Sequence, residues 1–210
     1  MNVVKWPVPI HPGEPCGALF SYAMTLDDAA RGFKVLESIR EHSDLTILDS
    51  GAFSVRRRGK VVDIDRYGAF AAEAARNGLV DVVVNLDVGD TVEMRRNFHS
   101  LRRRVGDMAY TMWVHQPFMG WDSLEDSARR FPYVGLGTAG MDSGSHAVRR
   151  TDDERDYYRA AHRVLDGYQS SAHGFAMTAV PLLYDKPLHW MTVDSSTWVG
   201  SDRFGFGVIP

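Results

Sequence analysis

Three aspartates and two histidines stand at or near the points where short β-rich runs of the sequence end. In chain order they are Asp49, Asp87, His115, His173 and Asp194. A cluster of carboxylates can divide two tasks: one attacks an electrophilic carbon, while a second, whose pKa is raised by burial and by its neighbour, carries a proton. Glycosyl transfer with retention needs such a pair.

Each of these residues also has an ordinary structural explanation. An Asp after a strand often caps the following turn, and a lone His is often a satisfied core residue. Asp and His at strand ends can instead hold a metal ion, but the first strand has no His-x-His and no helix has His-Glu-x-x-His, so the metal pattern is generic. The joint pattern favours a functional carboxylate cluster.

The elements that must position these side chains alternate along the chain. Period-two and apolar runs predict strands at 17–23, 45–49, 80–87, 109–115, 133–138, 171–178, 189–194 and 203–209. Helical periodicity predicts helices at 26–41, 64–77, 91–104, 123–130, 152–168 and 180–184. The segments "TLDD", "DID" and "GDTVE" place Thr or Asp where they can cap three of these helices.

Strands alternating with helices predict an α/β fold, a compact (β/α)₈ TIM-type barrel formed by a single domain over residues 1–210. The first predicted strand lacks the Gly-rich loop of a dinucleotide-binding open sheet. We expect the last helix to be short or missing, because the final predicted strand ends beside the last residue. In such a barrel the C-terminal ends of the strands converge on one mouth, where the acids would gather.

Composition sets the protein class. A hydrophobic content of 44% fits a globular protein, and a formal charge of −3 gives no global attraction to nucleic acid. The single cysteine, Cys16, excludes an internal disulfide framework and a zinc site made of several thiolates. With no signal peptide or apolar membrane span, the sequence predicts a cytoplasmic protein without a membrane partner.

Three segments resemble the tRNA-guanine transglycosylases. "ILDSGAFS" resembles their Asp-Ser-Gly-Gly-Phe-Gln segment, and "YVGLGTAG" resembles their Gly-Gly-Leu-x-x-Gly loop. The third, "AHGFAMTAVPLLYDKPLHWMTVDSSTW", resembles the stretch that leads from a Gly-Val-Gly strand to the nucleophilic aspartate. The order and spacing match over residues 45–198, and strings such as "HGFAMT" and "VDSSTW" are closest to the phage and bacterial DNA-modifying branch often called DpdA.

The resemblance implies roles for individual residues. Asp194 matches the nucleophile that attacks the sugar carbon, Asp49 the acid–base residue, and Asp87 a carboxylate that binds guanine-like bases. Backbone at Gly135 and Gly137 would approach the base, and either His115 or Gln116 would face it. Ser50 and Gly51 would form the turn that aims Asp49, and Phe53 would either stack on the base or belong to the core. His173 matches no catalytic group of the family.

The sequence also departs from the tRNA enzymes. Their Cys-x-Cys-x-x-Cys…His zinc site cannot be built with Cys16 alone, and the region that carries it is absent. The resemblance therefore favours DNA over tRNA as the polymer substrate. It implies two partners, a guanine target in DNA and a free 7-deazaguanine base, and it implies no metal and no cofactor. If the protein is phage-encoded, it would act in the cytoplasm of the host.

Basic residues near these motifs are candidates for phosphate contacts. "VRRRGK" follows the Asp49 turn, so we expect Arg56, Arg57, Arg58 and Lys60 at the barrel mouth. Arg203, after the nucleophile strand, is a further candidate. Trp198 would fill the gap left by a flipped base or stack on a neighbouring one, because a base inside a duplex cannot reach a buried acid. "LRRR", at 101–104, is better explained as cations at a helix C-terminus.

The leading hypothesis is a guanine transglycosylase acting on DNA, and alternatives stay open. The same chemistry could act on RNA, as in the tRNA-guanine transglycosylases. A metal-dependent TIM-barrel hydrolase would use the same acids and histidines as ligands, and a noncatalytic nucleic-acid-binding barrel would use only the cations. An assembly of identical chains could cover the incomplete end of the barrel.

Overall fold

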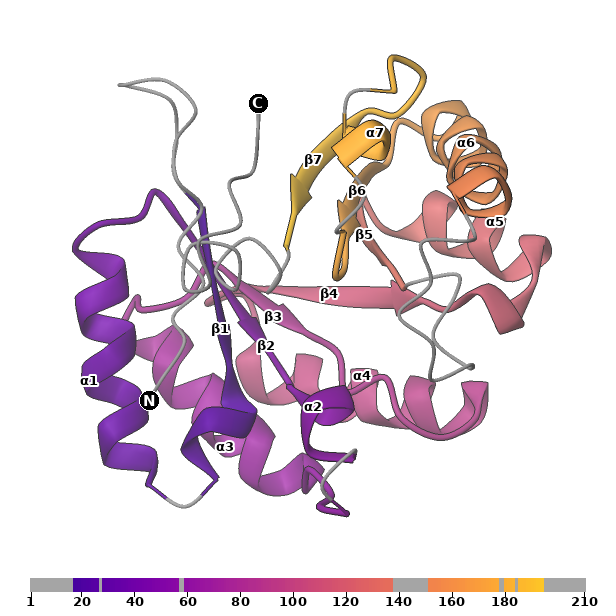
Figure 1. Cartoon of the computed structure of the whole chain (residues 1–210). Coiled ribbons are helices and arrows are strands. Elements are labelled where there is room, and N and C mark those ends of the chain that lie inside the picture. The colour runs from indigo at the N-terminus through magenta and orange to yellow at the C-terminus, as the bar shows by residue number, and fades with distance from the viewer. Residues whose placement is uncertain are drawn as a thin grey trace. The chain divides into compact units, whose positions relative to one another are not determined.

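The structure is a computed structural model that describes residues 17–26, 28–56, 59–137, 151–177, 180–183 and 185–194. Its strands are hydrogen-bonded in the order β1-β2-β3-β4-β5-β6-β7, every neighbouring pair is parallel, and helices alternate with them (Figure 1). The chain divides into two compact units, Met1–Met112 and Trp113–Pro210, with the boundary inside β4 (Tyr110–His115). The predicted alternation of strands and helices is confirmed.

The first unit holds the N-terminal part of the sheet. Its elements are β1 (Gly17–Ser21), the 3-10 helix η1 (Tyr22–Thr25), α1 (Ala29–Arg40), β2 (Leu45–Asp49), α2 (Ala52–Arg56), α3 (Ile64–Arg76), β3 (Val82–Val84) and α4 (Thr91–Val105). Ser21 pairs in register with Asp49, and Ile47 with Val82. Helices α3 and α4 lie side by side (Figure 1).

The core of the first unit forms where the buried strand residues meet the apolar faces of the helices. Leu48 and Val83 from the strands, and Leu36 and Tyr67 from the helices, are all fully buried. Full burial of each such side chain contributes roughly 1.5–3 kcal/mol. The ring of Tyr22 contacts the rings of Tyr67 and Phe70 at centroid distances of 5.2 Å, which fixes α3 against the start of the chain's first crossover.

Three helices begin at the aspartates that the sequence predicts as caps. Asp28 accepts a hydrogen bond from the backbone N–H of Arg31, and Asp63 accepts one from Arg66. Asp90 accepts one from the N–H of Glu93 at 2.9 Å. Each cap satisfies an N–H that the first turn of a helix leaves without a partner.

The second unit continues the sheet from β4. Its further elements are the 3-10 helix η2 (Pro117–Met119), α5 (Trp121–Arg130), β5 (Tyr133–Leu136), α6 (Thr151–Gly167), β6 (Ser171–Gly174), α7 (Val180–Leu183) and β7 (Trp190–Val193). Trp190 packs edge-on against His162 and Tyr158 of α6, so this helix covers one side of β7. Burial lowers the pKa of His162 to about 4, which keeps its ring neutral in that apolar setting.

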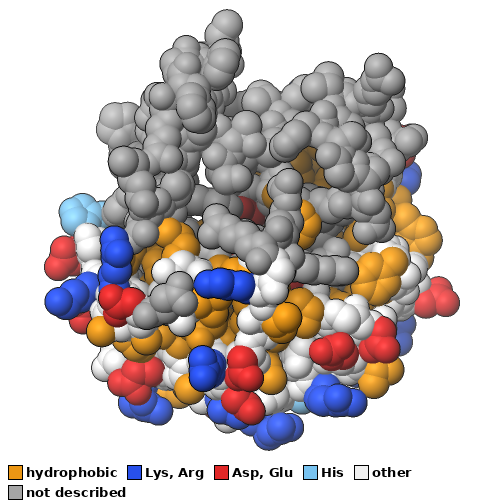
Figure 2. Space-filling view, turned by 60° about the horizontal axis from the view of Figure 1, so that its bottom comes forward, with side chains coloured by type: hydrophobic (Ala, Val, Ile, Leu, Met, Phe, Trp, Pro, Cys, Tyr) orange, Lys and Arg blue, Asp and Glu red, His pale blue; other side chains and the backbone are white. Residues whose placement is uncertain are grey.

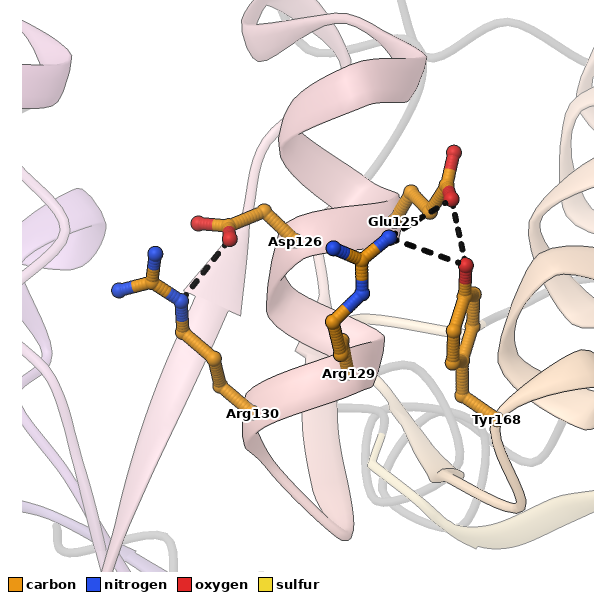
Figure 3. A network of polar contacts seen from close by, with 5 residues as sticks. All are labelled: Glu125, Asp126, Arg129, Arg130 and Tyr168. Carbon is orange, nitrogen blue, oxygen red and sulfur yellow. Dashed lines mark hydrogen bonds and ion pairs between the residues drawn. The ribbon is translucent and has the colours of Figure 1, made fainter.

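Exposed ion pairs support the surface of α5. Arg129 donates to Glu125 at 3.2 Å and Arg130 to Asp126 at 2.9 Å, each one helical turn apart (Figure 3). The hydroxyl of Tyr168, which follows α6, donates to Glu125 and so joins the two helices. Solvated pairs of this kind contribute about 0.3–0.5 kcal/mol each, so the buried face of α5 matters more for stability.

Several predicted strands end earlier than the sequence indicated. The run 80–87 becomes β3 only over Val82–Val84. Beyond it, the Asn85 amide donates to the carbonyl of Met94 and the Asn97 amide donates to the carbonyl of Leu86, which makes the segment a braced loop. The strand predicted at 17–23 ends at Ser21, and the strand predicted at 171–178 ends at Gly174.

Two further differences concern α2 and the end of the chain. α2 follows the Asp49 turn and was not predicted, because five residues are too few for helical periodicity to show. The strand predicted at 203–209 and any helix after it lie outside the described residues. The single-domain expectation for residues 1–210 stays a prediction. No helix in the described ranges is both long and apolar enough to span a bilayer.

Candidate functional site

Asp194 directly follows β7 and is only 8% exposed. Its Oδ1 accepts a hydrogen bond from the N–H of Ala176 at 2.9 Å. Its backbone carbonyl accepts from the N–H of Met177 at 2.7 Å, and its own N–H donates to the carbonyl of Gly174 at 3.0 Å. The loop after β6 therefore fixes both the backbone and the carboxylate of this aspartate.

That loop has an unusual backbone conformation. Ala176 has a positive φ of 50°, which residues other than glycine adopt at a cost of the order of 1 kcal/mol. Its N–H points at the Asp194 carboxylate as a result, a charge-assisted contact that offsets the cost. A strained residue that binds a buried carboxylate is typical of a functional site.

The imidazole of His173 faces the same carboxylate. Its Nε2 lies 3.5 Å from Oδ1 of Asp194, and the ring is 1% exposed. This distance is within ion-pair range but too long for a formed hydrogen bond. His173 has no role in the sequence analysis, because its neighbours follow from strand pairing. Thr192, which contacts the other ring nitrogen, lies in register with His173.

In the first unit, Asp49 ends β2 and is half-buried. Its Oδ2 accepts a hydrogen bond from the N–H of Gly51 at 3.0 Å, and Oγ of the buried Ser50 accepts from the N–H of Ala52 at 3.3 Å. The predicted Asp-Ser-Gly turn is present. Because the Gly51 N–H donates to the Asp49 carboxylate, the turn orients this carboxylate. The turn leads directly into α2.

Gly51 is required in this turn for two reasons. Its φ is 69°, in the left-handed region that side chains disfavour. A Cβ at this position would also lie 2.2 Å from Oγ of Ser21 and 2.4 Å from Cβ of Ala23. The close approach of the turn to the end of β1 is possible only without a side chain.

Tyr67 connects the end of β2, which carries Asp49, with the end of β3, which Asp87 follows. Its buried hydroxyl has one proton, which is shared between the carbonyl oxygen of Val84 at 2.7 Å and that of Leu48 at 3.2 Å. Burial raises the pKa of Tyr67 well above its usual value, and the negative charges of Asp49 and Asp87 raise it further. The hydroxyl therefore stays protonated.

In the second unit, the two residues after β4 that could face a base differ in their exposure. His115 is 1% exposed, and burial lowers its pKa to about 4, so its ring is neutral at pH 7. Gln116 is half-buried and lies against Gly137, where an added Cβ would be 2.2 Å from the Gln116 Oε1. Gln116 and Gly137 thus lie together beyond the ends of β4 and β5, and Gly135 is buried within β5.

The remaining residues predicted to contact the base or the DNA are Phe53, the cations and Trp198, and the structure describes only some of them. Phe53 is 49% exposed on α2, so it does not belong to the core. Lys60 is exposed, whereas the side chain of Arg56 and all of Arg57, Arg58, Trp198 and Arg203 lie outside the described residues. In "LRRR", Arg104 pairs with Asp65 of α3, consistent with a structural role for this run. Basic and acidic side chains are interspersed on the face in Figure 2.

The predicted residues fall in both units. In the first, the charges of Asp49 and Asp87 both raise the pKa of Tyr67. In the second, Gln116 lies against Gly137, and Asp194 faces His173. Within the described ranges, no group of three or more His, Cys, Asp or Glu side chains is arranged to hold a metal ion. Tyr67 was missed because a tyrosine in an amphipathic helix has no sequence signal beyond an ordinary core residue.

The Asp49 turn can be tested with a pair of glycine substitutions. Gly51→Ala adds both backbone strain and a steric clash, so we expect a loss of about 2–4 kcal/mol in the free energy of unfolding. Gly78→Ala is the matched control, because Gly78 has a φ of 66° but nothing within 4 Å of an added Cβ. The control should lose only about 1 kcal/mol in urea unfolding. Equal losses would contradict the close contact with Ser21 and Ala23.

The burial of His115 predicts a dependence of stability on pH. Its pKa is near 4 when folded and about 6.5 when unfolded, so between these values the unfolded chain binds more protons. The stability due to the neutral ring is full above pH 6.5 and falls as the pH falls toward 4. From pH 7 to 5 the loss should be about 2 kcal/mol.

Replacing the ring measures this contribution. In His115→Leu, the difference between the free energies of unfolding at pH 7 and pH 5 should shrink by about 2 kcal/mol relative to the unchanged protein. Denaturant unfolding at both pH values gives the two differences, and other titrating groups cancel in the comparison. An unaltered difference would show that His115 titrates as it does in the unfolded chain.

Comparisons with known proteins bear on the fold. No family model matches the chain, and no curated protein matches it in sequence. Among solved structures it is similar to a TIM-barrel chain from the tryptophan synthase a2b2 complex of the hyperthermophile Pyrococcus furiosus, with a TM-score of 0.50 and 18% identity. The match covers 83% of this chain and 66% of that chain, slightly less than two thirds of its length. The predicted fold class is confirmed: this is an α/β protein of the TIM-barrel type.

Proposed function

We propose that this protein is an enzyme, a base-exchange glycosyltransferase that replaces guanine in DNA with a free 7-deazaguanine base. The observation that carries the proposal is Asp194, a buried carboxylate fixed at the end of β7 by the loop after β6. A nucleophile held in one orientation before the substrate binds needs less ordering to reach the transition state. The resemblance of three ordered segments to guanine transglycosylases supports the same role.

In the first step, an oxygen of Asp194 attacks C1′ of a deoxyguanosine. The bond from C1′ to N9 of guanine breaks, and the base leaves with the electron pair while the sugar becomes covalently attached to Asp194. A proton transferred to the leaving base neutralises its developing charge. We assign this transfer to Asp49, which matches the acid–base residue of the guanine transglycosylases in the segment "ILDSGAFS".

The second step reverses the first with a different base. The incoming 7-deazaguanine gives its N9 proton to Asp49, and N9 attacks C1′. The bond between the sugar and Asp194 then breaks, which restores the carboxylate. Protons and electrons balance over the cycle without an oxidant or reductant, and the chain keeps its sugar configuration because two inversions occur.

Other residues would bind and select the base. An ionised carboxylate accepts hydrogen bonds only, and Asp87 would therefore bind the adjacent ring N–H and exocyclic amine of guanine-like bases. We assign the base contact after β4 to Gln116 in preference to His115, because His115 is buried whereas Gln116 is partly exposed. Because a stacked base cannot reach Asp194, the target must be flipped from the duplex or lie in unpaired DNA.

An exchange assay tests the function. Guanine-containing DNA and a labelled 7-deazaguanine base are incubated with the protein, and the label in DNA is measured with time. Asp194→Asn keeps the oxygen that accepts from Ala176 but removes the nucleophile, so we expect incorporation to fall at least about 10³-fold. Asp122→Asn, at an exposed acid on α5, is the matched control and should keep full activity.

Parallel arms separate the alternatives. If the label enters RNA of the same sequence but not DNA, the polymer substrate is RNA and not DNA. Hydrolysis that stops with a chelator and returns with a divalent ion would favour a metal-dependent hydrolase. Salt-sensitive DNA binding with no change in the bases would favour a noncatalytic barrel. Undiminished incorporation by Asp194→Asn would overturn the assignment of the nucleophile.

A further inference from the structure

A row of polar side chains leads across three strands of the second unit to Asp194. The hydroxyls of Tyr133 on β5 and Thr192 on β7 are hydrogen-bonded. Thr192 Oγ1 lies 2.5 Å from Nδ1 of His173 on β6, and Nε2 of His173 lies 3.5 Å from Oδ1 of Asp194. Tyr133, Thr192 and His173 perform no step of the proposed base exchange.

Strand register explains how these side chains meet. Gly135, His173 and Thr192 are aligned across β5, β6 and β7. Tyr133 lies two residues before Gly135 and therefore on the same face of the sheet. Gly135 presents no side chain beside His173, and the ring of Tyr133 lies edge-on to the imidazole at a centroid distance of 6.5 Å. The register thus gathers the row on one face.

The direction of the hydrogen bonds follows from what each group can donate. An ionised Asp194 can only accept, so His173 must carry its proton on Nε2 to interact with it. The neutral ring then accepts at Nδ1 from the Thr192 hydroxyl, and the Thr192 oxygen accepts from Tyr133. In this arrangement the Thr192 hydroxyl both donates and accepts, and the Tyr133 hydroxyl donates. A doubly protonated ring would instead donate to both Asp194 and Thr192.

The contact between His173 and Asp194 is incomplete in this structure. Among the described residues, Nε2 of His173 is buried without a hydrogen-bond partner, which is costly for a polar group. A shift of a few tenths of an ångström toward Oδ1 would form the hydrogen bond. Contacts between catalytic groups are often long before the substrate binds and shorten in the complex.

We propose that His173 is a positioning residue for Asp194: oriented by Thr192 and Tyr133, its Nε2–H holds the Asp194 carboxylate for attack on the sugar. This inference rests on the proposed function for the role of Asp194 as the attacking group. The contact between His173 and Asp194 rests on the geometry of the row alone. Ala176 and His173 would then hold Oδ1 from two sides, one through the backbone and one through a side chain.

Two substitutions of His173 separate its two contacts. The amide nitrogen of Gln can occupy the position of Nε2 and donate to Asp194, whereas Asn reaches only the position of Nδ1. We expect His173→Asn to lower the rate of guanine release about 10²-fold with unchanged DNA affinity. His173→Gln should retain most of the rate. Equal losses in the two variants, at equal stability in urea unfolding, would overturn the positioning role.

A measurement without substrate tests the geometry separately. Ring ¹⁵N resonances of His173 report the environment of each nitrogen. Asp194→Asn should shift the Nε2 resonance, and Thr192→Val should shift the Nδ1 resonance. An Nε2 resonance that Asp194→Asn leaves unmoved would overturn the inference, whatever the activity. If Asp194→Asn shifts the Nε2 resonance but the protein performs no base exchange, the proposed function is wrong and the contact between His173 and Asp194 still holds.

Discussion

The parallel pairing of the strands is the constraint on which the rest of this structure depends. Parallel strands end at the same edge of a sheet, so the residues that follow them are gathered without being close in sequence. In the first unit, β2 and β3 pair in parallel, so that Asp49 ends β2 and Asp87 follows β3 in the same direction. In the second, the pairing places Asp194 beside His173 and Gln116 beside Gly137.

Hydrogen bonds to backbone groups then fix what the pairing gathers. The Tyr67 hydroxyl holds the carbonyls at the ends of β2 and β3, and the Gly51 N–H holds the Asp49 carboxylate. The loop after β6 holds Asp194 through the N–H groups of Ala176 and Met177. Candidate catalytic groups are therefore positioned by the ordered backbone around them, which makes their orientation part of the fold.

Most of the fold could be predicted from the sequence, because strand and helix periodicities alternate strongly and aspartates mark three helix starts. Strand ends were predicted less well. The segment after Val84 is apolar enough for a strand, but the amides of Asn85 and Asn97 bind carbonyls from residues distant in sequence. Helix α2 was missed because it is one short turn that depends on the bend at Gly51.

The candidate site was predicted only in part, because periodicity locates the ends of strands but not the contacts made there. Acids that end strands can be located from periodicity: Asp49 does end β2 and Asp194 directly follows β7, whereas Asp87 lies three residues beyond the end of β3. The supporting residues were not predicted, since Tyr67, Thr192 and Ala176 have ordinary identities and their roles arise from register and backbone angles. His173 was visible as a buried histidine, but only the pairing of β6 with β7 places it opposite Thr192 and close to Asp194.

The most direct test of the central claim is to capture the glycosyl–enzyme bond. Protein and guanine-containing DNA are mixed without an incoming base, the reaction is quenched rapidly, and the digested protein is examined by mass spectrometry. We expect a sugar–peptide adduct at Asp194, formed in equal amount to the guanine released. Release of guanine without an adduct, or an adduct at a different residue, would contradict the proposed mechanism.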